Sequence, residues 1–135
     1  MKILFKNGDI KKFSHKINNV DIAAFESGIV HPVYSTFALC RDAEWSGRLF
    51  VLEMKEDDEE GIGTMIQIKH ISPAFVGEIV EFVAKFDCIT EKQEIITHFE
   101  AICNNRTIAI GTQGQKILKK EKIKSLFEQL QLKKQ

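Results

Sequence analysis

The sequence predicts an α+β fold in which a strongly twisted antiparallel sheet wraps around one long central helix. One stretch, from about residue 35 to residue 54, has helical spacing that is interrupted only by Gly47. Most of the chain that follows alternates between apolar and polar residues with the period of two that is typical of strands. Short turns between these segments favour an antiparallel meander, and one helix packed on such a sheet is an α+β arrangement.

The bulk composition is that of an ordinary soluble globular protein, with 44% hydrophobic and 28% charged residues. We expect residues 1–135 to form a single domain, because a chain of this length can bury one substantial core. The formal net charge is zero, so neither nucleic acid nor a membrane is expected as a partner. No segment has the apolar length of a secretory signal or a membrane span.

The cysteines indicate a reducing environment. Cys40, Cys88 and Cys103 are odd in number and form no C-x-x-C pair, which argues against a disulfide framework and against a zinc site. We therefore expect reduced thiols in a cytoplasmic protein, with no metal and no resident cofactor.

The first thirty residues of the chain are expected to be irregular. The stretch from Ile3 to Ile17 predicts one or two short strands. The stretch from Phe25 to Pro32 predicts a loop, because Gly28 and Pro32 punctuate it and Pro32 biases His31 toward an extended conformation.

The long helix is predicted to begin at Ser35 or Thr36, both of which are suitable N-caps, and to end near Met54. Small residues at helical spacing predict a stripe that lies close to the sheet, and three leucines are expected to widen the buried face: Cys40, Ala43 and Gly47, with Leu39, Leu49 and Leu52. Five adjacent acids from Glu56 to Glu60 then predict a solvated loop rather than a cation site.

Four antiparallel strands and a short C-terminal helix are predicted to follow. The strands are expected at Ile62–His70, Ile79–Phe86, Glu94–Cys103 and Thr107–Leu118, with Asn104 and Asn105 as a hairpin turn. Alternation places one set of side chains of the first strand on a single face, toward the helix: Ile62, Thr64, Ile66, Ile68 and His70. The tail from Lys119 carries apolar residues at helical spacing: Ile123, Leu126, Phe127 and Leu130.

Three side chains are the candidate catalytic groups. His70 is expected at a strand end beside the helix, where the alternative is an ordinary hydrogen-bonded histidine. Thr36 could be only a helix cap, and Glu44 could be only a solvated helix residue. In a regular helix the eight residues between Thr36 and Glu44 span roughly 12 Å, so the two cannot bond directly. Either Thr36 lies outside the regular helix, or another chain segment bridges the two residues, and a facing subunit could supply that bridge.

Other polar groups give weaker predictions. His31 lies in the predicted loop and could line a pocket mouth, whereas His15 and His98 have no such context. No histidine pair has metal-ligand spacing, and no glycine-rich phosphate loop is present. The lysines of the tail indicate either a solvated helix face or a contact with the phosphates of a nucleotide-bearing ligand.

Several motifs taken together resemble the fluoroacetyl-CoA thioesterase-like branch of the hotdog-fold thioesterases. The segments are VYSTFALCRDAEW, GIGTMIQIKH, a glycine seven residues after the histidine (Gly77), and EAICNNRTIAIGTQGQKIL, which contains Gly111 and Thr112. The matched features are a threonine at the helix start, Glu-Trp on the helix, Gly-Thr opening the next strand and a histidine ending it: Thr36, Glu44-Trp45, Gly63-Thr64 and His70. The resemblance covers roughly residues 33–118, and the loop before Val33 departs from it.

The resemblance implies a hotdog fold, hydrolysis of a short or medium acyl-CoA thioester to free acid and CoA, and a homodimer or higher homo-oligomer with sites near the subunit interface. CoA is then part of the substrate. Thr36 would be the nucleophile or position a water, and His70 would be the base. Glu44 would orient the imidazole or act as a base, and backbone N–H groups of Gly63, Thr64 or the helix start would serve the oxyanion.

Two other functions remain open from the sequence. A hotdog hydratase or dehydratase acting on an acyl-CoA would also use a histidine and a carboxylate. A non-catalytic acyl-CoA-binding module would keep the fold without turnover. The sequence does not distinguish CoA from acyl carrier protein as the thiol carrier.

Overall fold

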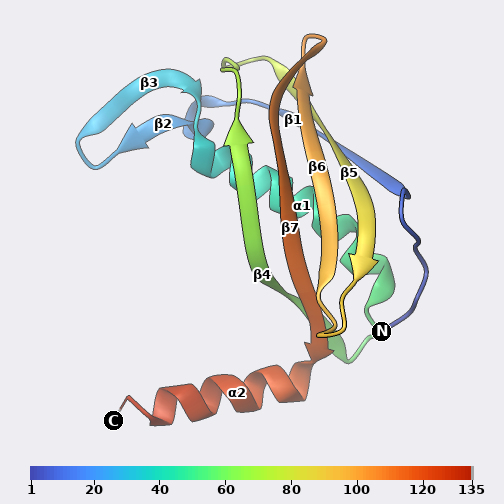
Figure 1. The fold of residues 1–135 in the computed structure, drawn as a ribbon. Helices are drawn as coiled ribbons and strands as arrows, with labels where there is room; N and C mark the ends of the chain where they lie inside the picture. Colours follow the sequence, from blue (N-terminus) through green and yellow to red (C-terminus); the bar gives the residue numbers. More distant parts are fainter. Residues whose placement is uncertain (135) are drawn as a thin grey trace.

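The computed structural model describes residues 1–134 and has two helices and two sheets (Figure 1). In chain order the elements are β1 (Ile10–Lys16), the short 3-10 helix η1 (Asn19–Asp21), β2 (Ile22–Phe25), β3 (Gly28–Tyr34), α1 (Thr36–Met54), β4 (Glu59–His70), β5 (Ile79–Ile89), β6 (Ile95–Cys103), β7 (Arg106–Lys119) and α2 (Lys120–Leu132).

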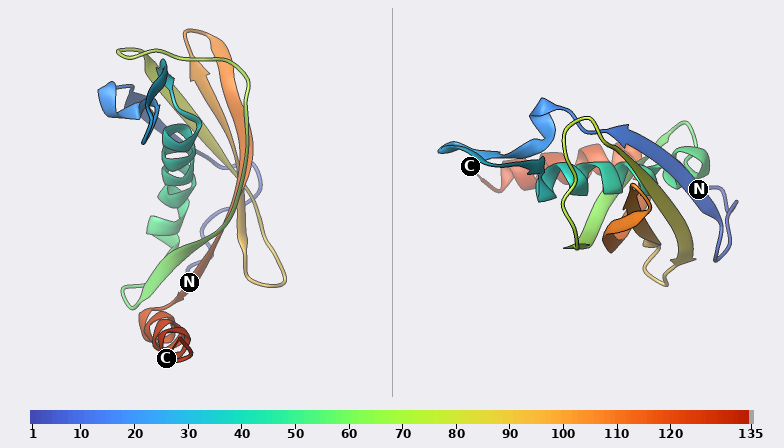
Figure 2. Two further views of the ribbon diagram at one scale, coloured as in Figure 1. Left: turned by 90° about the vertical axis from the view of Figure 1, so that its left-hand side faces the viewer. Right: turned by 90° about the horizontal axis from the view of Figure 1, so that it is seen from above.

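The main sheet is entirely antiparallel and has the order β1-β5-β6-β7-β4. It twists strongly and curves around α1, which lies along one face (Figure 2). The predicted α+β arrangement is therefore confirmed, with one long helix held by an antiparallel sheet and a C-terminal helix beyond it. In this sheet β1 and β4 are the two edge strands, so one side of β4 has no strand beside it.

The core lies between α1 and the concave face of the sheet. Nine residues of α1 are buried: Ala38, Leu39, Asp42, Ala43, Ser46, Gly47, Phe50, Val51 and Met54. Ser35 caps the helix, since its hydroxyl accepts the Ala38 N–H at 3.1 Å, which leaves Thr36 in the first turn with its side chain exposed. The predicted helix bounds are thus confirmed, and the cap is Ser35 rather than Thr36.

A close helix–sheet approach occurs at Gly47. A Cβ atom there would lie 1.8 Å from Nε2 of Gln113 on β7. The glycine leaves room for this buried amide, which donates to the Ala43 carbonyl at 3.0 Å. Of the predicted small-residue stripe, Ala43 and Gly47 are buried and Cys40 is half-buried, while Leu52 of the predicted buried face is exposed.

The predicted loop at residues 25–32 was wrong, because this stretch belongs to an exposed hairpin formed by β2 and β3. Glu26 and Ser27 form its turn, and Gly28 has a positive φ of 114°. Pro32 does not prevent strand formation here, because it has no partner in the register of β3 with β2 and so its missing N–H costs no ladder bond.

The predicted solvated acidic loop was wrong for its last two residues, which belong to β4. Glu59 is 6% exposed and pairs with the terminal amino group of Met1 at 3.0 Å. The same carboxylate oxygen, Oε1, also accepts the Glu56 N–H at 2.8 Å, and Oε2 accepts from the Met1 amino group at 3.1 Å, so this buried acid is fully partnered. Glu60 is half-buried and accepts from Arg48 at 2.9 Å.

The predicted single face of β4 is interrupted by a β-bulge. The pairing with β7 shifts between Gly63 and Met65, so two residues of β4 oppose one residue of β7. Gly63, Ile66, Ile68 and His70 face α1, and Thr64 faces away from it, as the contacts of Gly63 with Glu44 and of Thr64 with Glu94 require. The predicted inward orientation of His70 is confirmed, and that of Ile62 and Thr64 was wrong.

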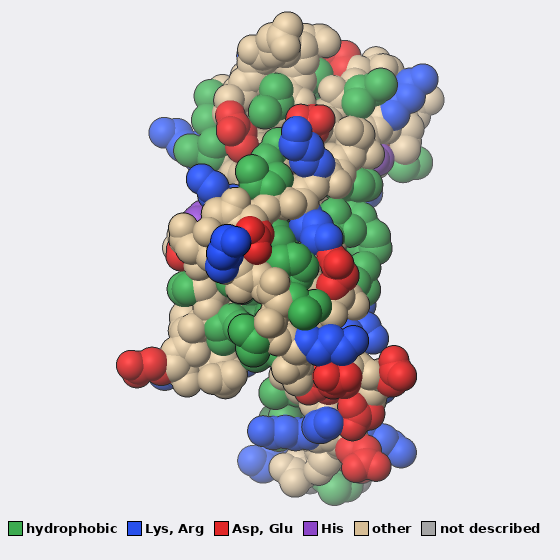
Figure 3. All heavy atoms as spheres, turned by 90° about the vertical axis from the view of Figure 1, so that its right-hand side faces the viewer, with side chains coloured by type: hydrophobic (Ala, Val, Ile, Leu, Met, Phe, Trp, Pro, Cys, Tyr) green, Lys and Arg blue, Asp and Glu red, His purple; other side chains and the backbone are tan. Residues whose placement is uncertain are grey.

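Helix α2 projects from the end of β7 away from the body (Figure 1) and contains no buried residue. No helix among residues 1–134 has the length and apolar character needed to cross a membrane. On the face shown in Figure 3, lysine, arginine and acidic side chains are interspersed, so this face carries no broad patch of one charge.

Candidate active site

The start of α1 and the end of β4 bring two of the predicted catalytic residues into contact. Oγ1 of Thr36 lies 3.1 Å from Nδ1 of His70, within hydrogen-bonding distance. The two side chains line an open depression together with the residues that follow His70: Ile71, Ser72 and Pro73. A hydroxyl within hydrogen-bonding distance of an imidazole, in a depression open to substrate, is the arrangement that activates an oxygen nucleophile or a bound water.

The protonation of His70 suits a general base. Burial lowers the pKa of its imidazole, and a hydrogen bond with the Ser72 backbone opposes this effect in part. The ring is therefore neutral at neutral pH and can accept a proton. Its Nε2 atom is buried without a hydrogen-bond partner in the described chain. Thr36, which contacts Nδ1, is therefore the side chain that hydrogen-bonds the imidazole.

Glu44 lies elsewhere on α1, two helical turns beyond Thr36. Its carboxylate lies against Gly63 of β4, where a Cβ atom would come within 2.6 Å of Oε1. Glu44 lines a depression together with residues of α1, β4 and β7: Arg41, Trp45, Arg48, Gly61, Gly63 and Gln115. The Glu44 side chain is exposed in this chain.

Within one chain, Glu44 is too far from the Thr36–His70 pair to act on it. Gly63, which Glu44 touches, and His70 lie in the same strand and are seven residues apart. A strand rises about 3.3 Å per residue, so these two positions are separated by roughly 20 Å. The structure therefore brings together Thr36 and His70 and leaves Glu44 apart from both.

The predicted substrate-binding residues also separate. Gly63 adjoins Glu44, as described above. The Thr64 hydroxyl donates to the Glu94 carboxylate on the outer face of the sheet. His31 lies exposed on β3, opposite Ala23. A role for the backbone N–H groups of Gly63 and Thr64 toward an oxyanion stays a prediction, as does the role of His31.

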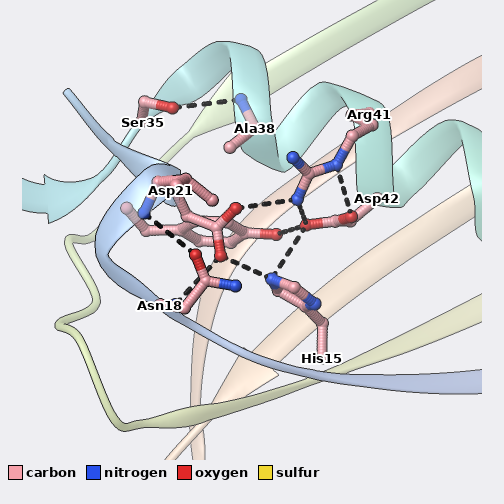
Figure 4. A network of polar contacts seen from close by, with 9 residues as sticks. His15, Asn18, Asp21, Ser35, Ala38, Arg41 and Asp42 are labelled. Carbon is pink, nitrogen blue, oxygen red and sulfur yellow. Dashed lines mark hydrogen bonds and ion pairs between the residues drawn. The ribbon is translucent and has the colours of Figure 1, made fainter. Parts of the chain in front are cut away.

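A buried polar network beneath the start of α1 was missed by the sequence reasoning (Figure 4). Nη2 of Arg41 contacts Asp21 at 2.9 Å, and its Nε contacts Asp42 at 3.0 Å. His15 contacts Asp21 at 2.7 Å, and the Tyr34 hydroxyl donates to Asp42. Every one of these carboxylates is paired, which is what burial of a charge requires.

The network fixes the position of the helix start. Asp21 also accepts the Asn18 N–H, and its own carbonyl accepts the Ser35 N–H at 2.8 Å. Ser35 immediately precedes Thr36, so the network holds the backbone that presents the Thr36 hydroxyl to His70. The sequence signal was weak, because Asp21, Tyr34 and Asp42 are far apart in the chain and each is an unremarkable residue by itself.

A second threonine–histidine pair lies on the outer face of the sheet. His98 contacts Thr112 at 2.8 Å through Nδ1 and Asp87 at 2.7 Å through Nε2. These groups are solvent-exposed or half-exposed and lie on the face of the sheet opposite α1. Because the Thr112–His98 pair has the same two types of side chain as the Thr36–His70 pair, variants of it can serve as controls. No cluster of metal-ligating side chains occurs among residues 1–134.

The fold and the Thr36–His70 pair together define a hotdog-fold protein of the thioesterase class. The family model described as the fluoroacetyl-CoA-specific thioesterase FlK matches residues 17–121, which is most of the chain. The chain therefore belongs to this family, and membership confirms the predicted enzyme class, a hydrolase of acyl-CoA thioesters.

Solved structures agree with this assignment. A hypothetical protein of Thermus thermophilus, described as a thioesterase superfamily member, is 30% identical, with a TM-score of 0.89 over 94% of this chain and 93% of that one. The fluoroacetyl-CoA thioesterase FlK has the same fold at 17% identity, with a TM-score of 0.84 over 94% of this chain and 98% of its own. A hot-dog-like protein of Thermanaerovibrio acidaminovorans gives a TM-score of 0.81 at 15% identity, covering 91% of each chain. No curated protein matches the sequence.

Proposed function

We propose that this chain hydrolyses short or medium acyl-CoA thioesters to the free acid and CoA at the Thr36–His70 pair. The observation that carries the proposal is the 3.1 Å contact between the Thr36 hydroxyl and Nδ1 of His70. A neutral imidazole in hydrogen-bonding contact with a hydroxyl at a helix start can activate an oxygen nucleophile. The fluoroacyl preference in the family's name is not part of the proposal.

The chemistry can follow two routes at this pair. Either the Thr36 oxygen or a water that it holds attacks the thioester carbonyl carbon, and His70 takes the proton that this oxygen loses. The carbonyl oxygen then carries negative charge, which free backbone N–H groups at the start of α1 would stabilise. The tetrahedral intermediate expels the CoA thiolate, which takes the proton back from the imidazolium. On the Thr36 route, water then hydrolyses the acyl-threonine in a second addition.

The proposed dimer would complete this site with Glu44 of the partner subunit. One side of β4 has no neighbouring strand, and an edge of this kind can pair with the same edge of another copy. An antiparallel pair of β4 strands, with its two-fold axis near Ile66, would place Gly63 of the partner subunit opposite His70. Because Glu44 lies against Gly63, the partner's carboxylate would then approach His70 and Thr36.

This arrangement removes the separation within one chain, where Glu44 lies roughly 12 Å along α1 from Thr36 and adjoins Gly63, roughly 20 Å along β4 from His70. Each chain would supply Thr36 and His70 to one site and Glu44 to the other. The carboxylate would stabilise the imidazolium that forms when His70 accepts a proton. An isologous dimer of this type contains two identical sites.

The proposed reaction requires no resident cofactor, because CoA enters as part of the substrate. Cys40, Cys88 and Cys103 are all free thiols in the described chain, which supports the proposed cytoplasmic location.

The test is a panel of short and medium acyl-CoAs with detection of the released thiol. We expect Thr36→Ala and His70→Ala to lower kcat/KM by about 100-fold or more, in line with the loss of a catalytic nucleophile or base. Thr112→Ala on the outer face is the matched control and should retain wild-type turnover. If Thr112→Ala abolishes hydrolysis while Thr36→Ala does not, the site has been assigned to the wrong threonine–histidine pair.

The same panel separates the alternatives. Addition of water to an enoyl-CoA without release of thiol would indicate a hydratase. Tight binding of an acyl-CoA without any turnover would indicate a binding module.

A further inference from the structure

Helix α2 has an apolar stripe that the rest of residues 1–134 leaves mostly uncovered. The stripe consists of Ile123, Leu126, Phe127 and Leu130, spaced to lie on one side of the helix. Leu126, Phe127 and Leu130 are 41%, 55% and 60% exposed. A helix of 13 residues is marginal in water by itself, so a covering surface would stabilise it.

The direction of α2 indicates where that surface lies. In Figure 1 the helix leaves the end of β7 and passes beyond β4, the edge strand of the sheet. Figure 2 shows the helix end-on from that side, which confirms that its axis runs out past this edge. The proposed partner subunit occupies the space beside the same edge.

Antiparallel pairing determines which part of the partner meets the helix. Helix α2 projects at the end of the sheet where β4 begins, since Lys119 pairs with Glu59. The beginning of one β4 strand would adjoin the end of the other, so α2 would lie where β4 of the partner subunit ends. The loop that follows His70 there is apolar and uncovered, with Ile71, Phe75 and Val76 exposed at 50%, 48% and 44%.

We propose that α2 is an exchanged arm that packs its apolar stripe on the 71–78 loop of the partner subunit. The inference rests on the proposed dimer and goes beyond it, because it assigns a second contact to the same partner. Ile71 lines the depression of the Thr36–His70 pair, so each arm would form part of the wall of the other chain's active site.

The net positive charge of the α2 segment also favours docking on a second copy of the chain. The segment from Lys119 to Lys134 contains six lysines and two glutamates, and the neutral chain therefore carries an equal negative excess elsewhere. A positive arm is attracted to a negative body, which favours docking on another copy. Direct packing of two α2 stripes on each other would instead bring flanking lysines together.

Pairwise crosslinking tests the contact. In a Cys88→Ser background, which removes the exposed native thiol, Leu130→Cys and Phe75→Cys are combined in one chain. With an added thiol oxidant that accepts the two electrons of disulfide formation, thiols held in contact react at an effective concentration in the millimolar range, so a covalent dimer should form about 100-fold faster than by free collision. The matched control is Ser125→Cys with Phe75→Cys, because Ser125 is exposed on the other side of α2. Each single variant controls for self-pairing.

A second measurement uses the uncrosslinked enzyme. Leu126→Ser with Leu130→Ser should raise KM for acyl-CoA several-fold, whereas Ser125→Ala should leave KM unchanged. The proposal is overturned if the Leu130–Phe75 pair crosslinks no faster than the Ser125 control. Binding of α2 to vesicles of anionic phospholipid, with no such crosslink, would assign the stripe to a membrane surface and also overturn it.

These outcomes are distinguishable from a failure of the proposed function. Light scattering measures the dimer, and release of thiol from acyl-CoA measures hydrolysis, without reference to α2. A hydrolytic dimer that gives no Leu130–Phe75 crosslink would refute the arm alone.

Discussion

At the scale of single residues, the chemistry depends on the protonation of His70. Burial lowers the pKa of this imidazole below 6.5, its ordinary value, so it is neutral through the physiological range. If His70 is the base, kcat/KM should be constant near pH 7 and should fall about tenfold per pH unit below the lowered pKa. A pH profile of thioester hydrolysis measures this midpoint.

The outer-face histidine serves as the control for this profile. His98→Asn should leave the midpoint unchanged, because His98 bonds Asp87 and Thr112 on the other side of the sheet. A midpoint that moves in His98→Asn, or a rate that does not fall at acid pH, would contradict the role of His70.

The buried carboxylate of Asp21 gives a prediction about stability. Burial acts to raise its pKa, but hydrogen bonds from the Asn18 backbone, Arg41 and His15 together lower it below 3.8. A depressed pKa means that the carboxylate contributes stability above the unfolded-state value and loses it as the pH falls through the folded-state value. Asp21→Asn should cost about 1–3 kcal/mol at pH 7, because Arg41 and His15 would lose a charged partner.

Denaturant unfolding at several pH values measures this effect. Below about pH 4 the unfolding free energy of the wild type should fall more steeply than that of Asp21→Asn. An exposed acid in a turn, Glu91, provides the control variant Glu91→Gln, which should follow the wild type. Parallel curves for Asp21→Asn and the wild type would show that the network does not hold the folded state.

At the scale of secondary-structure elements, the close packing of α1 on the sheet depends on Gly47. A methyl group at this position would overlap the buried Gln113 amide, which is bonded to the Ala43 carbonyl. Gly47→Ala should therefore destabilise the fold by about 1–3 kcal/mol, although alanine is the better helix former. Thermal or denaturant unfolding measures the loss.

A double-variant cycle identifies the cause. Gln113→Ala removes the nearest of the two side chains that the new methyl group would overlap, the other being Thr97 with its Oγ1 at 2.8 Å. Gly47→Ala should therefore cost less in the Gln113→Ala background than in the wild type. Equal costs in both backgrounds would show that the clash with Gln113 is not responsible.

The elements differ in how far the sequence predicted them. Helix α1 and the four strands after it were predictable, because long periodic segments carry their own signal. The bulge at Gly63–Met65 was not, since the sequence alternates without a break while the pairing with β7 shifts. The hairpin of β2 and β3 was also missed, because Gly28 and Pro32 punctuate strands as well as loops.

The candidate site was likewise predicted only in part. The inward orientation of His70 followed from alternation, and its contact with Thr36 agrees with the predicted pair. The position of Glu44 relative to them could not be predicted, because in the proposed dimer it would depend on the pairing of β4 at an edge and on a second chain. The network of Asp21, Arg41 and Asp42 joins segments that no local pattern relates.

At the scale of the whole molecule, the open edge of β4 and the uncovered stripe of α2 both point to a dimer. Within the described chain Glu44 does not reach the Thr36–His70 pair, because it lies beside Gly63, seven residues before His70 in β4. In the proposed dimer an antiparallel β4 pair would bring these separated parts together. The chemistry of the proposed enzyme therefore depends on its assembly.

Complementation between two inactive variants tests this claim most directly. Thr36→Ala and Glu44→Gln are unfolded, mixed in equal amounts, refolded together and assayed for thiol release from acyl-CoA. In random dimers half are mixed, and each mixed dimer has one intact site, so about one quarter of wild-type activity should return. Thr36→Ala mixed with His70→Ala is the control and should remain inactive, because both residues serve the same site from the same chain. Recovery in the first mixture alone is the predicted result, and no recovery in that mixture would contradict a site shared between subunits.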